Sequence, residues 1–210
     1  KVTHAYLFTG TRGTGKTSTA KILAKAVNCP HTQDGNPCGE CEICRGIDDG
    51  TVMDVLEIDA ASNNGVDNIR QLREDAYFAP GQAKYRVYII DETHMLSTGA
   101  FNALLKIMEE PPEGVMFLLT ASSAAAVLPT IRSRCAAYTM APVPTEECAA
   151  ALRTAQPELN EQNAQDLAFL YEGHIGLCLK ALTDPAAKAA RAAARELCRQ
   201  AQQQDTYRVQ

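Results

Sequence analysis

The sequence lacks tryptophan, and phenylalanine and tyrosine make up only 6% of its 210 residues. It also has no signal peptide and no apolar run long enough to cross a bilayer, so no membrane span is expected. Positive charge is not in excess, because 20 lysines and arginines face 25 acidic residues, for a net charge of −5. This balance excludes an overall basic field, so any contact with nucleic acid must come from a local patch.

The hydrophobic content of 46% is sufficient for a core, and the length suits one large or two small domains. The chain begins with Lys1, almost directly on the first expected strand, and it ends near a run of three glutamines. We therefore expect a fragment that lacks upstream residues and is cut before a further segment.

A glycine-rich run near the N-terminus follows the pattern of a phosphate-binding loop, two glycines four residues apart and then Lys and Thr. Its backbone N–H groups would converge on phosphates, the lysine would add a charge, and the threonine hydroxyl would bind Mg²⁺. An apolar run at residues 5–8 predicts a strand before the loop, and residues 16–27 predict a helix after it. An accidental glycine-rich turn is the alternative. The residues expected to bind nucleotide are Gly10, Thr11, Gly13, Thr14, Gly15, Lys16, Thr17 and Ser18.

A second apolar run, residues 86–92, ends in Asp91 and Glu92. It predicts a central parallel strand buried on both faces. Because open α/β sheets bind ligands at the carboxyl ends of their strands, we expect Asp91 to hold Mg²⁺ and Glu92 to act as general base toward water. A polar strand end that caps the next helix is the alternative.

Residues 28–50, rich in Gly, Pro, Asp and Cys, predict an insertion with little helix or strand. Cys29, Cys38, Cys41 and Cys44 offer four thiolates at spacings that suit a tetrahedral, structural Zn²⁺ site. A disulfide pair and a ligand role for His31 are the alternatives. The other four cysteines are scattered singly, and a nucleotide-binding loop belongs in a reducing compartment, so a cytoplasmic location is expected.

Further strands are predicted at residues 52–58, 115–119 and 137–140, and helices at 67–77 and at 97–110, where Ser97 is the expected N-cap. A linker, residues 142–144, precedes an Ala-, Gln- and Glu-rich segment that is helical throughout. We expect a parallel sheet flanked by helices in an α/β nucleotide-binding domain, residues 1–142, and a small all-α lid, residues 143–210.

Residues 120–123 place small hydroxylated side chains at the tip of the strand predicted at 115–119. One of these hydroxyls could contact the γ-phosphate or the attacking water. A simple helix N-cap is the alternative.

Taken together in their order along the chain, these motifs resemble those of the bacterial clamp-loader ATPases, which are AAA+ proteins of the DNA polymerase III holoenzyme. The resemblance is strongest to the gamma/tau type. The resemblance is dense over about residues 3–135 and loose beyond. The runs that carry it are residues 4–8, 10–17, 57–63, 90–94, 101–106, 109–112 and 133–135, with the four cysteines.

This resemblance implies a subunit of a hetero-pentameric ring that binds ATP, opens a sliding clamp and grips primed DNA. Hydrolysis then releases both. It also implies that Lys16 and Thr17 contact phosphate and Mg²⁺, that Asp91 belongs to the Mg²⁺ site and that Glu92 is the catalytic base. Arg134 would be an arginine finger that acts in the neighbouring subunit's site; a surface salt bridge is the alternative.

Two departures from the gamma/tau pattern bear on hydrolysis. The strand tip reads Ala121, Ser122, Ser123 where the family carries paired threonines and an acid, so Ser122 is the expected sensing hydroxyl. Gly176 stands where the family places a sensor arginine. The run at residues 128–135 and Gly176 look more like delta-prime, so a weakly hydrolysing or non-hydrolysing stator is the alternative function.

A DExH helicase is a further alternative, because residues 91–94 match its acidic box. Such an enzyme needs a second RecA-like domain, for which this sequence has no room. The aromatic pair Tyr77 and Phe78 marks a possible clamp-contacting surface, although core packing is the favoured interpretation of the pair.

Overall fold

The computed structural model describes the backbone of residues 2–205, and the side chains of these except at positions 195 and 202–205. The chain forms two compact units, Lys1–Ala141 and Pro142–Gln210. Each unit has its own hydrophobic core. Over the described residues, no helix combines the length and apolar character needed to cross a membrane.

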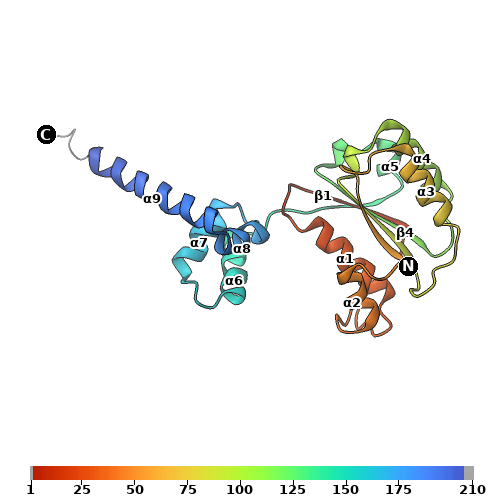
Figure 1. Cartoon of the computed structure of the whole chain (residues 1–210), viewed down its shortest axis with the longest axis horizontal. Helices are drawn as coiled ribbons and strands as arrows, with labels where there is room; N and C mark the ends of the chain where they lie inside the picture. The colour runs from red at the N-terminus through yellow and green to blue at the C-terminus, as the bar shows by residue number, and fades with distance from the viewer. Residues whose placement is uncertain (1, 206–210) are drawn as a thin grey trace. The chain divides into compact units, whose positions relative to one another are not determined.

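The first unit is built on a parallel sheet of five strands in the order β2-β3-β4-β1-β5 (Figure 1). The central strand β4 is buried along its whole length, as expected of a parallel strand covered on both faces. The strands are β1 (Ala5–Thr9), β2 (Val55–Asp59), β3 (Arg86–Asp91), β4 (Val115–Ala121) and β5 (Ala136–Thr139).

The register aligns the carboxyl ends of three neighbouring strands. Thr9 of β1 pairs with Ala121 of β4, and Ile90 of β3 pairs with Leu119 of β4. The loop that follows β1 and the carboxylate that ends β3 therefore lie at the same edge of the sheet, with the tip of β4 between them.

Helices cover both faces of the sheet. Val87, Ile89 and Leu118 pack with α1 on one face, and Tyr88 and Ile90 pack with α3 and α4 on the other. This alternation follows from the two-residue period of a strand. The helices of this unit are α1 (Lys16–Asn28), α2 (Glu42–Asp49), α3 (Val66–Asp75), α4 (Thr98–Glu109) and α5 (Pro129–Arg132), with short 3₁₀ turns η1 (Thr93–Met95) and η2 (Ala124–Ala126).

The prediction that residues 28–50 contain little helix was wrong, because α2 forms within them. The Cys41 side chain accepts a hydrogen bond from the backbone N–H of Cys44 and caps this helix. Ile47 is buried, and Lys25 of α1 forms an ion pair with Asp48 at 2.7 Å. Tertiary contacts thus stabilise a helix of eight residues that composition alone disfavours.

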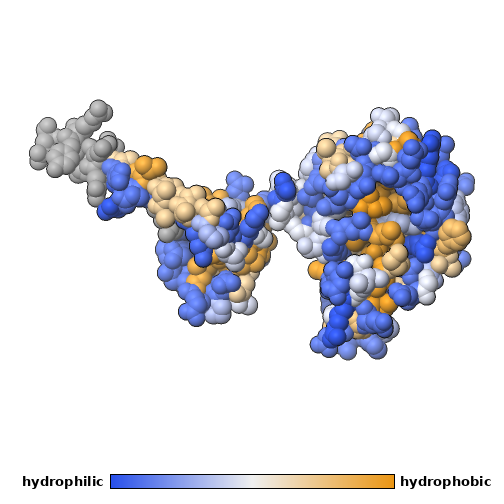
Figure 2. Space-filling model, viewed as in Figure 1, coloured by the Kyte–Doolittle hydropathy of each residue, from blue (hydrophilic) through white to orange (hydrophobic). Residues whose placement is uncertain are grey.

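Core packing of Tyr77 and Phe78 was also a wrong expectation. Both side chains follow α3 and are 68% exposed. Apolar surface occurs elsewhere on this unit too, since a groove of about 470 Å³ beside the edge strand β2 is lined in part by Val52, Met53 and Leu56. Figure 2 shows apolar side chains among hydrophilic ones on one face of the unit.

Between Pro142 and position 205 the second unit contains helices and connecting loops without any strand, as predicted. Its core contains Cys148, Leu152, Leu167 and Cys178, which belong to three different helices. The Asn160 side chain caps the second of them by accepting a hydrogen bond from the Asn163 N–H at 2.8 Å. The helices are α6 (Thr145–Ala155), α7 (Glu161–Leu170), α8 (Ile175–Thr183) and α9 (Pro185–Asp205).

Candidate nucleotide-binding and metal sites

The loop between β1 and α1 has a backbone that only glycine adopts readily. Gly10 has a φ of 153°, and a Cβ on it would lie 2.4 Å from the carbonyl oxygen of Met140. Gly15, the residue before α1, is left-handed with a φ of 82°. The first turn of α1 carries no acidic residue, so its N–H groups present an uncompensated positive end to an anion.

Lys16 is buried inside this loop. Its Nζ donates hydrogen bonds to the carbonyl oxygens of Gly10 and Thr11, each at 3.0 Å. The Thr14 hydroxyl donates to the same Thr11 carbonyl at 2.8 Å. The ammonium is therefore held at the centre of the loop, where phosphate oxygens would compete with these carbonyls for its protons.

Thr17 and Asp91 meet at the carboxyl edge of the sheet. The Thr17 hydroxyl donates to Asp91 Oδ1 at 3.0 Å, although the residues are 74 positions apart. An octahedral Mg²⁺ with ligands at about 2.0–2.1 Å places neighbouring ligand oxygens about 2.9 Å apart. A hydroxyl and a carboxylate oxygen at this separation fit two adjacent ligands of one Mg²⁺.

Thr120 joins the two acidic residues, a role that the sequence interpretation missed. It is fully buried near the end of β4, and its hydroxyl donates to Asp91 Oδ1. The hydroxyl oxygen of Thr120 also accepts a hydrogen bond from the Glu92 N–H at 3.0 Å. The available signal was a single hydroxyl at the end of an otherwise apolar strand. Burial keeps this hydroxyl from water and thus fixes both acidic residues relative to β4.

Glu92 adopts the left-handed backbone conformation, with a φ of 51° and a ψ of 42°. Its Oε2 lies 3.4 Å from His94 Nδ1, and His94 Nε2 lies 3.5 Å from the Ser122 hydroxyl. The His94 ring therefore lies between the candidate base and the candidate sensing hydroxyl, and its buried Nδ1 makes no hydrogen bond of its own within the described part of the chain.

Arg134 contacts groups of its own chain, just after α5. Its guanidinium donates to Glu109 Oε1 and to the Thr130 carbonyl oxygen, each at 2.8 Å. Because the side chain is about one-third exposed, solvent screens this ion pair, and the pair adds little to stability.

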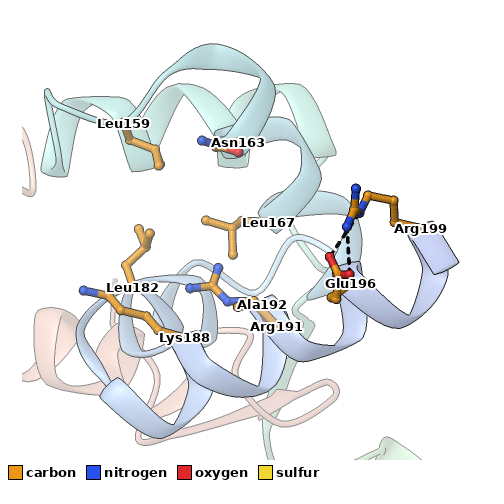
Figure 3. Close-up of a pocket in the computed structure, with 9 residues that line it drawn as sticks. All are labelled: Leu159, Asn163, Leu167, Leu182, Lys188, Arg191, Ala192, Glu196 and Arg199. Atoms are coloured by element: carbon orange, nitrogen blue, oxygen red, sulfur yellow. Dashed lines mark hydrogen bonds and ion pairs between the residues drawn. The ribbon is translucent and has the colours of Figure 1, made fainter.

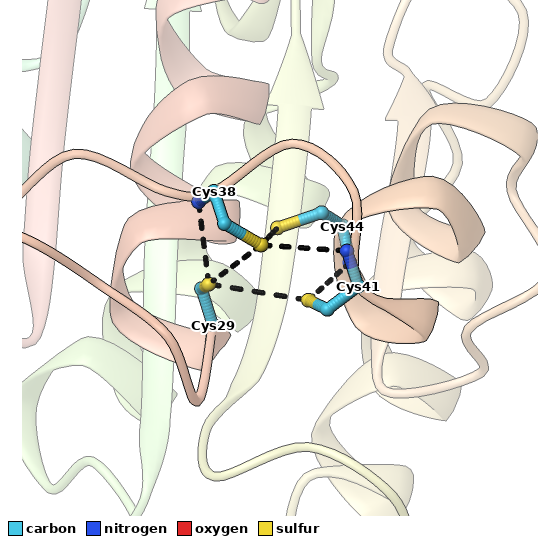
Figure 4. Close-up of side chains that lie close together, drawn as sticks. All are labelled: Cys29, Cys38, Cys41 and Cys44. Carbon is cyan, nitrogen blue, oxygen red and sulfur yellow. Dashed lines mark hydrogen bonds between the residues drawn. The ribbon is translucent and has the colours of Figure 1, made fainter.

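The four cysteines predicted as metal ligands come together between α1 and α2 (Figure 4). Their sulfur atoms all lie within 4.8 Å of one another, and the Sγ of Cys29 is 3.6 Å from that of Cys38 and 3.9 Å from that of Cys41. Sulfur ligands about 2.3 Å from a tetrahedral Zn²⁺ lie about 3.8 Å apart. The cluster therefore fits one metal ion of that size.

The environment of this cluster favours a thiolate at one position. The backbone N–H of Cys38, and to a smaller extent that of His31, donates to the Cys29 sulfur and lowers the pKa of that thiol to about 6, against the effect of burial. Burial raises the pKa of Cys44 to about 12 in the absence of a metal. His31 faces the cluster with its backbone only, and its side chain is exposed, which disfavours it as a ligand.

The second unit contains a separate cavity of about 420 Å³ beside α9 (Figure 3). Lys188, Arg191 and Arg199 line it together with Glu196, which pairs with Arg199 at 2.8 Å. None of the residues predicted to bind nucleotide or metal lines this cavity.

A family model described as "DNA polymerase III, delta subunit" matches residues 1–144. The chain belongs to this DNA polymerase III family. Its sequence is similar to the gamma and tau subunits in particular, which confirms the resemblance to clamp-loader gamma/tau proteins.

Three relatives illustrate this similarity. The chain is 61% identical over 135 residues to DNA polymerase III subunit tau of Bacillus subtilis, which covers 64% of the chain and 24% of that protein. It is 53% identical over 136 residues to subunit gamma/tau of Mycobacterium tuberculosis, with coverage of 64% and 24%. It is 47% identical over 147 residues to subunit tau of Escherichia coli, with coverage of 70% and 23%. The chain thus spans about a quarter of the length of these relatives.

Solved structures share the fold of this family member. A gamma subunit-related protein of Thermotoga maritima matches with a TM-score of 0.53 at 24% identity, over 79% of the chain and 53% of that protein. The Thermotoga maritima RuvB Holliday junction branch migration motor matches with a TM-score of 0.57 at 16% identity, over 86% and 54%. The predicted fold, a parallel α/β domain flanked by helices with a cysteine cluster and a helical C-terminal part, is confirmed.

Proposed function

We propose that this chain is the ATP-binding and ATP-hydrolysing part of a DNA polymerase III clamp-loader subunit, which couples ATP to the loading of a sliding clamp on primed DNA. The observation that carries this proposal is the meeting of the Thr17 hydroxyl and the Asp91 carboxylate beside the phosphate loop. The similarity to gamma and tau subunits supports the same function.

Each site residue has a distinct proposed role. Lys16 and the loop amides hold the β- and γ-phosphates, and Thr17 and Asp91 hold the Mg²⁺, which neutralises phosphate charge when bound. Glu92 accepts the proton of the attacking water, and Ser122 senses the γ-phosphate. Arg134 leaves its partner Glu109 and acts in the site of the neighbouring subunit.

The proposed partners are other clamp-loader subunits in a hetero-pentameric ring, the sliding clamp and primed DNA, in the cytoplasm. The exposed pair Tyr77 and Phe78 supports a protein contact on the first unit, because two adjacent aromatic side chains at 68% exposure are a typical anchor for a partner. We propose that the sliding clamp is this partner.

We also propose that the four cysteines hold one structural Zn²⁺, and that residues 1–142 form the nucleotide-binding domain and residues 143–210 the lid. The sulfur separations support zinc, and the division into two compact units supports the two domains. A helicase and a non-hydrolysing stator are less well supported, because the relatives described above are gamma and tau subunits and the phosphate loop is intact.

The test is Glu92→Gln in the full-length subunit, reconstituted with its partner subunits. We expect ATP turnover to fall at least about 100-fold, because general base catalysis typically contributes 10²–10⁴-fold. The Kd for ATP should change less than about threefold. Glu113→Gln, which changes an exposed carboxylate ahead of β4, is the matched control and should leave turnover unchanged. Unchanged turnover in Glu92→Gln, or no ATP binding by the unaltered protein, would remove the proposed function.

A further inference from the structure

The His94 ring lies between two groups that the proposed function uses. Its Nδ1 is 3.4 Å from Glu92 Oε2, and its Nε2 is 3.5 Å from the Ser122 hydroxyl. The two ring nitrogens point in different directions. Nε2 is within hydrogen-bond distance of Ser122, whereas Nδ1 is buried near Glu92 without a hydrogen-bond partner among the described residues. His94 is only 21% exposed and Glu92 33% exposed, so water screens this contact only in part.

The backbone around the ring is held in place by its own hydrogen bonds. Thr93 is fully buried, and its hydroxyl donates to the Ile90 carbonyl oxygen at 2.9 Å. The Met95 N–H donates to the Glu92 carbonyl oxygen at 2.8 Å and closes η1. Since Glu92 itself is left-handed and its N–H is bound by Thr120, the turn has little freedom to carry His94 elsewhere.

The Ser122 hydroxyl has a single proton. It can donate this proton to His94 Nε2 or to a phosphate oxygen of the nucleotide, but not to both. A neutral imidazole that accepts at Nε2 carries its own proton on Nδ1, which faces the Glu92 carboxylate. The group to which Ser122 donates its proton therefore determines the tautomer of His94. The tautomer in turn determines whether Glu92 faces an N–H group or a bare ring nitrogen.

We propose that His94 is a positioning residue that couples Ser122 to Glu92, so that the orientation of the base depends on whether Ser122 contacts the γ-phosphate. This proposal rests on the proposed function. It adds to that function a route by which occupation of the phosphate position reaches the group that activates water.

The experiment uses the full-length subunit in the reconstituted complex and compares His94→Ala, His94→Gln, Ser122→Ala and the double variant His94→Ala with Ser122→Ala. We expect His94→Ala to lower kcat about tenfold, with the Kd for ATP within about twofold, because it removes orientation of the base and leaves phosphate binding intact. His94→Gln should restore at least about a third of kcat, since its amide offers both a donor and an acceptor.

The double variant tests the coupling itself. If His94 and Ser122 act through each other, their effects on kcat should not multiply. The kcat of the double variant should then lie within about twofold of that of the slower single variant. Binding of a non-hydrolysable ATP analogue should also shift the ring ¹⁵N resonances of His94, and Ser122→Ala should remove most of that shift. Met95→Ala, which changes an exposed neighbour in the same turn, is the matched control and should leave both readouts unchanged.

The outcomes separate this proposal from the one on which it rests. If Glu92→Gln abolishes turnover but His94→Ala does not lower kcat, or if the effects of His94→Ala and Ser122→Ala multiply, the coupling is wrong and the proposed function stands. If Glu92→Gln has no effect, the proposed function fails and the coupling fails with it.

Discussion

Thr120 shows how much a single buried hydroxyl arranges at this site. Its oxygen accepts the backbone N–H of Glu92 while its proton goes to Asp91, so the Asp91 carboxylate and the Glu92 backbone are both held from the strand between β1 and β3. A buried hydroxyl of this kind is costly to replace, because its loss would leave the Glu92 N–H without this partner and remove one of the two hydrogen bonds that Asp91 Oδ1 accepts.

Gly173 is a second residue whose identity is dictated by its backbone conformation and by the space around it. It has a φ of 75°, and a Cβ there would lie 1.8 Å from the carbonyl oxygen of Val143. We expect Gly173→Ala to lower the free energy of unfolding of the second unit by about 3 kcal/mol or more, because backbone must move to relieve the clash. A urea titration of the chain followed by circular dichroism measures this change.

Gly176 provides the matched control three residues later. A Cβ there meets no atom within 4 Å, and the residue lies in α8 with a negative φ. Gly176→Ala should leave stability unchanged or raise it by up to about 1 kcal/mol, as alanine favours a helix over glycine. Equal midpoints for the two variants would contradict the role given to Gly173.

At the scale of elements, Asp54 connects the start of β2 to the loop before β3. Burial disfavours its charged form, but the N–H groups of Gly81, Gln82 and Ala83 together with the Arg86 guanidinium outweigh burial and hold its pKa below the usual value. Its side chain is 3% exposed, so this network is shielded from solvent.

This network predicts a pH-dependent stability. A carboxyl whose pKa is lower in the folded state stabilises the fold above its unfolded pKa of about 3.9, and this contribution is lost as the pH falls through the folded value. We expect Asp54→Asn to lower the free energy of unfolding at pH 7 by about 3 kcal/mol, because it leaves Arg86 without its buried partner.

Denaturant titrations at several pH values measure this effect, and the difference from the unaltered protein should shrink below about pH 4. Asp67→Asn is the control, since its pair with Arg70 is exposed and should contribute less than about 1 kcal/mol. A loss that is independent of pH would show that the charge of Asp54 is not the cause.

The α2 helix depends on the cysteine cluster, so metal should control its stability. We expect one zinc per chain by elemental analysis, and at least about a tenfold rise in amide hydrogen exchange across residues 29–49 after chelation, since metal binding free energy is folding free energy in such sites. β3 and β4 should keep their protection.

Two variants make the zinc prediction specific. Cys38→Ser should lose the metal, whereas Cys198→Ser, which changes an exposed cysteine of α9, should retain it. A protein without zinc, or with zinc unaffected by Cys38→Ser, would contradict the proposed site.

These elements also show what could be predicted from the sequence. β3 and β4 are continuous apolar runs, and α4 has an apolar face and a Ser97 cap, so local pattern was sufficient for them. α2 could not be predicted in this way, because Gly46 and the two aspartates at its C-terminal end disfavour a helix. Its stability comes from a cysteine cap and a lysine on another helix. The exposure of Tyr77 and Phe78 could not be predicted either, because the hydrophobicity of a residue does not show whether it lies in the core or on a contact surface.

The candidate site likewise has features that could be predicted from the sequence and features that could not. The phosphate loop, the acidic pair and the cysteines have fixed local spacings, and the rule that ligands bind at strand ends predicted that the first two would meet. The roles of Thr120 and His94 depend on the strand order, which places β4 between β1 and β3. Local patterns contain no information about such neighbours.

At the scale of the whole molecule, the role proposed for Arg134 lies in a site that a neighbouring subunit would complete. In the reconstituted complex we expect Arg134→Ala to lower ATP turnover at least about 100-fold, with the Kd for ATP within about threefold, because an arginine finger stabilises charge that develops in the transition state. Steady-state turnover and equilibrium nucleotide binding measure the two effects.

Glu109→Gln distinguishes this role from that of a surface ion pair. It removes the partner that Arg134 has within its own chain. If Arg134 mattered only through that pair, Glu109→Gln would reproduce the loss of turnover; we expect it to leave turnover unchanged. Arg132→Ala, which changes an exposed arginine two positions away, should also have no effect.

The two ends of α1 lie in two different candidate sites, the phosphate loop and the cysteine cluster. Lys16 begins the helix within the phosphate loop, and Cys29 caps its other end. Thirteen residues make a shaft about 20 Å long, too short to bend appreciably. Oxidants or cadmium that attack the thiols would therefore act at one end of a rigid helix whose other end lies in the phosphate loop, and under the proposed function they would slow ATP turnover without entering the nucleotide site.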